Sequence, residues 1–148
     1  MKVAVSACLL GRPCRYDGKS KPCEAVHAFV EDLDVVPVCP EVMGGLSIPH
    51  PPSEIQTKEP NLVVRDSAGK DTTEFFVQGA ENALEKALSN DVTHAILKAK
   101  SPSCGVGEIY DGTFSKTLVK GDGIATRLFK DAGICVATEK TFEEVFGL

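Results

Sequence analysis

The hydrophobic residues of this chain fall into short continuous runs separated by longer stretches of helical spacing. A short apolar run bounded by turn residues is typical of a buried strand. The runs predict core strands at Lys2–Ser6, residues 35–38, His94–Leu97 and residues 134–136, with a minor strand at residues 62–65. Pro37 lacks a backbone donor, so the second of these strands is expected at a sheet edge or at a position where the missing donor faces outward.

Apolar residues at helical spacing predict helices between these strands. A first helix over residues 22–32, with Ser20 before it, carries Val26, Phe29, Val30 and Leu33 on one face. A second covers residues 72–89, begins at the capping pair Asp71 and Glu74, and has the stripe Phe76, Ala80, Ala83, Leu84, Ala87 and Leu88. A third covers Ile124–Asp131, and a short terminal helix begins at Thr141 and Glu144.

Strands that alternate with helices predict an α/β fold, here a small Rossmann-like three-layer sandwich with a mainly parallel sheet. Right-handed crossovers give the expected strand order 2-1-3-4, with a switch point between the first and third core strands. Ligands bind such sheets at the carboxyl ends of the strands, beside the switch point. Residues 39–60 and 98–121 are expected to be long irregular loops, the first ordered for function. We expect residues 1–148 to form one domain.

Composition excludes several classes of protein. The 148 residues are 43% hydrophobic, which is enough for a core, and carry a formal net charge of −5. This acidic balance argues against general binding to nucleic acid. Neither a signal peptide nor a run of about 20 apolar residues is visible, so we expect a cytoplasmic protein with no membrane segment.

Three of the six cysteines follow predicted core strands. Cys8 comes after the first strand, Cys39 ends the second, and Cys104 lies in the loop after the third. The carboxyl ends of parallel strands share one edge, so these thiols are expected to converge. Cytosolic thiols stay reduced, which favours a metal or an iron–sulfur cluster over disulfides. Structural zinc stays open as the alternative, although the chain has no Cys-x-x-Cys pair.

The other cysteines are assigned separately. Cys14 lies in the same loop as Cys8 and either replaces a ligand or stands beside the site, whereas Cys23 and Cys135 are expected to be small buried hydrophobes. Basic residues in the first loop can lower thiol pKa values and balance an anionic cluster; they are Arg12, Arg15, Lys19 and Lys21.

Several polar residues flank these cysteines. Glu41 follows Cys39 by two positions, so in an extended segment it points to the same face and can act as a general base. Ser101, Ser103 and Lys100 precede or flank Cys104 and are candidates for holding a substrate, as is Lys98. His27 and His94 are expected to be structural. No glycine-rich nucleotide motif follows the first strand, so the fold does not imply a nucleotide cofactor.

Five segments together resemble a known family over nearly the whole chain. They are VSACLLG at residues 5–11, CRYDG at 14–18, VCPEVMGG at 38–45, KSPSCG at 100–105 and YDGTF at 110–114. They are similar to a bacterial family long catalogued as a domain of unknown function, whose characterised members are thiouracil desulfurases.

The resemblance implies a [4Fe–4S] cluster, three cysteine ligands and one open iron that takes the sulfur of a thiolated base. The implied reaction is non-redox desulfuration to uracil and sulfide. Cys8, Cys39 and Cys104 match the motif cysteines expected to ligate, and Cys14 matches another. Glu41 would act as the acid–base group and Ser101 as a positioning group. The competing class is a non-enzymatic module that binds zinc or a cluster, or a redox sensor.

Overall fold

A computed structural model describes all residues from 1 to 148. Strands and helices alternate along it, with a 3₁₀ turn, η1, after the first strand. In chain order the elements are β1 (Lys2–Ser6), η1 (Ala7–Leu10), α1 (Glu24–Val30), β2 (Asp34–Val38), α2 (Pro40–Met43), β3 (Ser53–Thr57), β4 (Val63–Asp66), α3 (Thr73–Ser89), β5 (His94–Leu97), β6 (Glu108–Tyr110), β7 (Leu118–Lys120), α4 (Ile124–Asp131), β8 (Cys135–Thr138) and α5 (Phe142–Val145).

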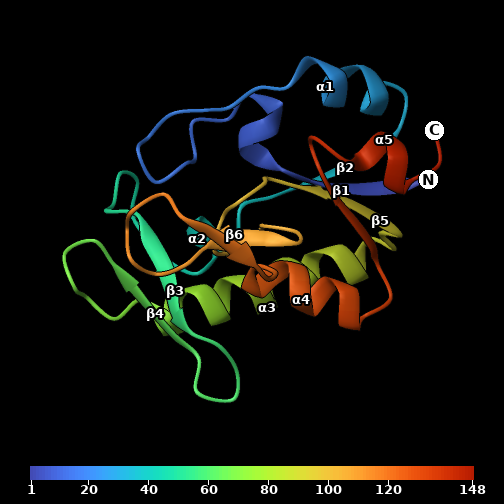
Figure 1. The fold of residues 1–148 in the computed structure, drawn as a ribbon. Coiled ribbons are helices and arrows are strands. Elements are labelled where there is room, and N and C mark those ends of the chain that lie inside the picture. The colour runs from blue at the N-terminus through green and yellow to red at the C-terminus, as the bar shows by residue number, and fades with distance from the viewer.

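The central sheet has four parallel strands in the order β2-β1-β5-β8. This order is the predicted 2-1-3-4, with the strand that contains Pro37 at one edge as expected. In Figure 1, α1 and α5 lie on one side of the sheet and α3 and α4 on the other. The predicted three-layer α/β sandwich is therefore confirmed.

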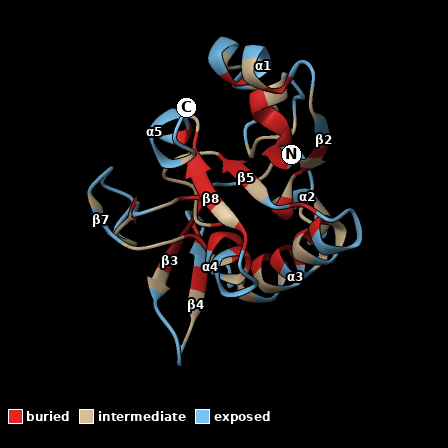
Figure 2. Ribbon diagram, turned by 90° about the vertical axis from the view of Figure 1, so that its right-hand side faces the viewer, coloured by how far each residue is buried: buried red, intermediate tan, exposed pale blue.

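Alternation along the strands divides the core between the two helical layers. On β1, Val3 and Val5 pack with α1 and α5, whereas Ala4 packs with α3 and α4. On β5, Ile96 packs with α1 and α5, and Leu97 packs with α3 and α4. Successive side chains of a strand point to opposite faces, so each central strand must be apolar throughout. In Figure 2 most of β5 and β8 is coloured as buried.

Some helix details differ from the prediction. Helix α1 begins at Glu24 with Cys23 as its N-cap, so Cys23 precedes the helix instead of lying within it. On α3, Leu88 is 49% exposed and does not belong to the buried stripe. Gly79 is buried there instead. Packing partners decided these points, and helical spacing alone does not reveal them.

The two stretches predicted as loops contain further structure. Residues 39–60 include α2 and β3, and β3 pairs antiparallel with the minor strand β4. Residues 98–121 include the antiparallel pair β6–β7. These strands are three to five residues long and lie outside the central sheet. Such short pairs carry little periodic signal, which explains why they were missed.

One face of α3 holds the end of β2 and the short helix α2. Lys86 Nζ donates to the Pro37 carbonyl at 2.7 Å, and Asn82 Nδ2 donates to the Met43 carbonyl at 2.8 Å. Gly79 lies so close that a Cβ there would be 1.9 Å from the Pro40 oxygen. Helix α3 therefore fixes the position of α2. No helix in the structure combines the length and apolar character needed to cross a membrane.

Candidate functional site

The cysteines leave the central sheet at one edge. Ser6 at the end of β1 lies opposite Val38 at the end of β2 in the parallel register. Cys8 follows in the turn η1, and Cys39 follows as the N-cap of α2. Cys104 is buried in the loop after β5. The strand topology thus brings together residues that are far apart in sequence.

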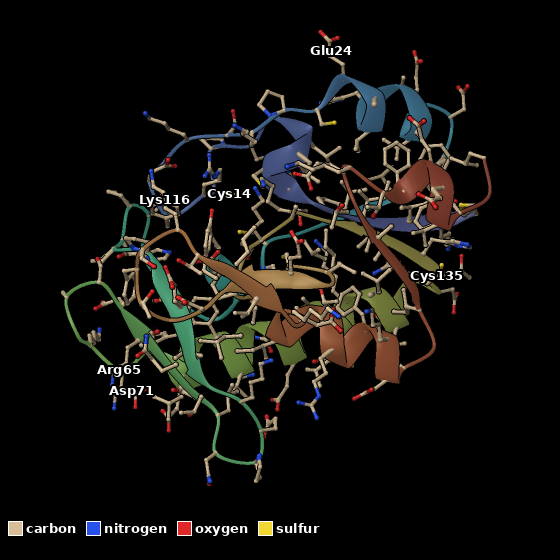
Figure 3. All side chains as sticks on the ribbon, viewed as in Figure 1. Cys14, Glu24, Arg65, Asp71, Lys116 and Cys135 are labelled. Carbon is tan, nitrogen blue, oxygen red and sulfur yellow. The ribbon has the colours of Figure 1, made fainter.

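A cavity of about 440 Å³ opens at this edge, and four of the six cysteines line it: Cys8, Cys14, Cys39 and Cys104. Its volume is in the usual range for ligand pockets, roughly 300–1,000 Å³. Lys116 lines the same cavity, and Figure 3 shows it on the same side of the molecule as Cys14. Cys135 lies at the opposite end of the sheet and is not part of the site.

The four thiols affect one another's protonation. A hydrogen bond between the Cys39 and Cys14 side chains lowers the pKa of Cys14 and raises that of Cys39. Burial, with a smaller effect of Cys39, raises the pKa of Cys8 to about 11. Burial also raises the pKa of Cys104, against a hydrogen bond from Ser6. Three of the thiols therefore hold their protons strongly unless a bound cation displaces them.

This donor set fits an iron–sulfur cluster. Thiolates are the protein ligands of such clusters, and four thiols face one cavity here. No three His, Cys, Asp or Glu side chains are placed to hold a single metal ion. Cys14 and Cys39 lie side by side, so the choice between them stays open on geometry.

Glu41 also lines the cavity, but its placement differs from the expected one. It lies in the first turn of α2, so the predicted extended segment was wrong, although the side chain reaches the predicted cavity. Its carboxylate lies 3.4 Å from His50 Nε2. Burial raises its pKa, while His50 and Arg15 act in the opposite direction.

Ser101 lines the cavity, and its hydroxyl oxygen accepts two backbone hydrogen bonds. They come from Ser103 N at 3.0 Å and Cys104 N at 3.1 Å. A serine oxygen has two acceptor positions and one proton, so the proton remains available as a donor. Ser103 is only 1% exposed and is not part of the cavity lining; its hydroxyl has no partner. The structure thus brings Ser101 but not Ser103 to the cavity.

Four cations line the cavity: Arg15, Lys98, Lys100 and Lys116. Lys98 Nζ pairs with Glu139 Oε2 at 3.1 Å, whereas neither Lys100 nor Lys116 has a carboxylate at ion-pair distance. Arg15 and Lys98 both lower the pKa of Cys8, against the larger effect of burial. The lining can therefore balance the negative charge of thiolates or of an anionic cluster.

Sequence reasoning missed several residues of the cavity, among them Glu54, Tyr16, Tyr110 and Phe114. Tyr16, Tyr110 and Phe114 belong to segments that carried the family resemblance, which was the only signal available for them. Glu54 lies on β3, within a stretch expected to be irregular. Cys23, His27 and His94 do not line the cavity.

Comparisons with known proteins agree with this arrangement. The family model described as 2-thiouracil desulfurase matches residues 3–141. The chain is similar to the solved structure of the [4Fe-4S]-dependent thiouracil desulfidase TudS, with 41% identity and a TM-score of 0.88 over 98% of this chain and 95% of that one. It is also 37% identical to the protein YbbK of Bacillus subtilis (strain 168), over 97% of this chain and 99% of that protein.

Proposed function

The chain belongs to the 2-thiouracil desulfurase family, and from that premise we propose that it is a [4Fe–4S]-dependent enzyme that desulfurates a thiolated pyrimidine such as thiouracil. The observation that carries the proposal is the cavity in which four thiols, Glu41 and Ser101 meet. The substrate is a small base, which a cavity of about 440 Å³ admits. The six free cysteines are consistent with action in the reducing cytoplasm.

The reaction replaces a carbon–sulfur bond by a carbon–oxygen bond without a change of redox state. Water supplies the oxygen, and the sulfur leaves with the protons of that water as hydrogen sulfide. Cys8, Cys39 and Cys104 would hold the cluster, with Cys14 as the alternative to Cys39. When bound, the cluster supplies a thiophilic iron without a protein ligand, which acts as a Lewis acid toward the sulfur of the base.

The remaining work falls to side chains of the cavity. Glu41 accepts a proton from the attacking water, since Glu41 lines the cavity and its carboxylate is in contact with His50. The free proton of Ser101 donates to the heteroatom that gains negative charge as water adds. Lys100, whose ammonium has no ion-pair partner, binds the exocyclic oxygen of the pyrimidine.

Anaerobic reconstitution followed by an activity assay tests this proposal. The loaded protein should be brown, should contain about four irons and four sulfides per chain, and should lose them in air. With 2-thiouracil it should release uracil and sulfide in equal amounts. A colourless protein with stoichiometric zinc, or a brown protein that releases no sulfide, would instead support the non-enzymatic module.

A further inference from the structure

The loop of residues 111–117, between β6 and β7, forms one wall of the cavity and has an unusual backbone. Phe114 and Lys116 line the cavity, and their φ angles are +57° and +61°. Residues other than glycine seldom adopt positive φ, and they do so when the surrounding structure holds them there. Lys100, which also lines the cavity, is a third such residue, with φ of +70°.

Strand β3 holds this wall loop in place. Glu54 Oε1 accepts hydrogen bonds from Gly112 N at 2.9 Å and from Phe114 N at 3.2 Å. Gln56 Nε2 donates to the Gly112 oxygen at 2.6 Å. Gly112 approaches β3 so closely that a Cβ would lie 2.8 Å from the Ile55 oxygen. Gly112 and Phe114 of the wall loop are therefore bound to one strand that is about 60 positions away in sequence.

One oxygen of the Glu54 carboxylate is occupied by these contacts with the wall loop. Glu54 is 8% exposed and lines the cavity. The cavity therefore contains two carboxylates, Glu41 and Glu54, as a catalytic acid–base pair would. One oxygen of Glu54, however, already accepts two backbone N–H groups. A buried carboxylate that satisfies main-chain donors orders the loop that carries them.

The result of this anchoring is the position of the Phe114 ring. Phe114 lines the cavity and is 38% exposed, so its ring is not fully covered by other side chains. Flat heterocycles stack on such rings through their π-faces, and loss of the aromatic partner costs a nucleobase contact about 1–3 kcal/mol.

We propose that Phe114 packs against the heterocyclic ring of the substrate and determines the affinity for it, and that Glu54 positions Phe114 through the backbone of the wall loop. This inference rests on the proposed function because it concerns the base bound in the same cavity. It assigns Glu54 no part in the chemical step. Phe114 is a specificity-determining contact, and Glu54 is a positioning residue.

The first test compares Phe114→Leu with Phe114→Tyr in the cluster-loaded protein. Leucine keeps an apolar side chain but has no π-face, whereas tyrosine keeps the ring. The dissociation constant of uracil, measured by calorimetry, should rise roughly tenfold in Phe114→Leu and stay near the parent value in Phe114→Tyr. KM for 2-thiouracil should rise in parallel, with kcat and iron content unchanged.

The second test compares Glu54→Gln with Glu54→Ala. The glutamine oxygen can accept the same two N–H groups without a charge, and alanine accepts none. Glu54→Gln should therefore keep the parent KM and kcat, and Glu54→Ala should raise KM as Phe114→Leu does. If Glu54→Gln loses kcat, the charge of Glu54 takes part in the reaction and the assignment of Glu54 is wrong.

The two proposals fail in different ways, since uracil binding does not require turnover. An unchanged uracil dissociation constant in Phe114→Leu overturns this inference, whether or not thiouracil is desulfurated. If Phe114→Leu weakens uracil binding but the parent protein releases no sulfide from 2-thiouracil, the proposed function is contradicted. The role of Phe114 in binding the heterocycle is still supported in that case.

Discussion

His50 orients Glu41 across a contact of 3.4 Å between Nε2 and the Glu41 carboxylate. The other ring nitrogen, Nδ1, lies 2.8 Å from the carbonyl oxygen of Pro51. A carbonyl can only accept, so Nδ1 donates to it, and the contact between Nε2 and the carboxylate is attractive when Nε2 or Glu41 also carries a proton. The backbone N–H of His50 in turn donates to the Tyr16 oxygen at 2.8 Å. Glu41 is therefore held in the cavity by a side chain that itself has a fixed orientation.

Replacing the Glu41 carboxylate should separate catalysis from cluster binding. Glu41→Gln keeps the shape of the side chain and its contact with His50, so iron content and visible colour should be those of the parent. Turnover of 2-thiouracil should fall roughly 10²–10⁴-fold, the contribution of general base catalysis. Normal turnover would show that the base lies elsewhere, and loss of colour would show that Glu41 supports the cluster.

Serine substitutions should identify the three ligands among the four cavity thiols. Cys8→Ser, Cys39→Ser and Cys104→Ser should each lose bound iron after reconstitution, because a hydroxyl is a poor iron ligand here. Cys14→Ser should keep its iron, and Cys135→Ser, far from the cavity, is the matched control. If Cys14→Ser loses iron and Cys39→Ser keeps it, the assignment of this adjacent pair is reversed.

Ser101 combines a loop contact with a free proton, and two variants should resolve these roles. Ser101→Ala removes the acceptor of two backbone hydrogen bonds and the hydroxyl proton that we propose donates to the substrate. Its kcat should fall roughly 10²-fold, as for loss of one donor to a developing anion. Ser101→Thr retains the hydroxyl and should restore most of kcat. Equal loss in both variants would contradict a role for the proton.

The close approach of α2 to α3 should make Gly79 intolerant of a side chain. A Cβ on Gly79 would meet the Pro40 oxygen at 1.9 Å, so Gly79→Ala must push α2 away from α3. Urea unfolding should show a loss of about 1–3 kcal/mol, typical of overpacking. Glu81→Ala, on the exposed side of the same helix, is the control and should be within about 0.5 kcal/mol of the parent. An unchanged midpoint in Gly79→Ala would contradict the steric argument.

The sheet could be predicted because its strands are apolar without interruption. Val3, Ala4 and Val5 are all buried, although their side chains alternate between the two faces of the sheet. A strand covered by helices on both faces therefore reads as a continuous apolar run in the sequence. Short elements outside that sheet, such as β3 and β6, obey no such constraint. The prediction of one domain over residues 1–148 stays a prediction.

By itself, the sequence determined where the site would form. Right-handed crossovers between buried parallel strands bring the ends of β1, β2 and β5 to one edge, so Cys8, Cys39 and Cys104 converge for topological reasons. Only the tertiary structure decided how the cavity is completed. Glu54 meets Phe114 across 60 positions, and Gly79 meets Pro40 across 39. Such contacts are made to main-chain groups, which every residue carries alike. They therefore produce no pattern of hydrophobic and polar residues from which the contact could be predicted.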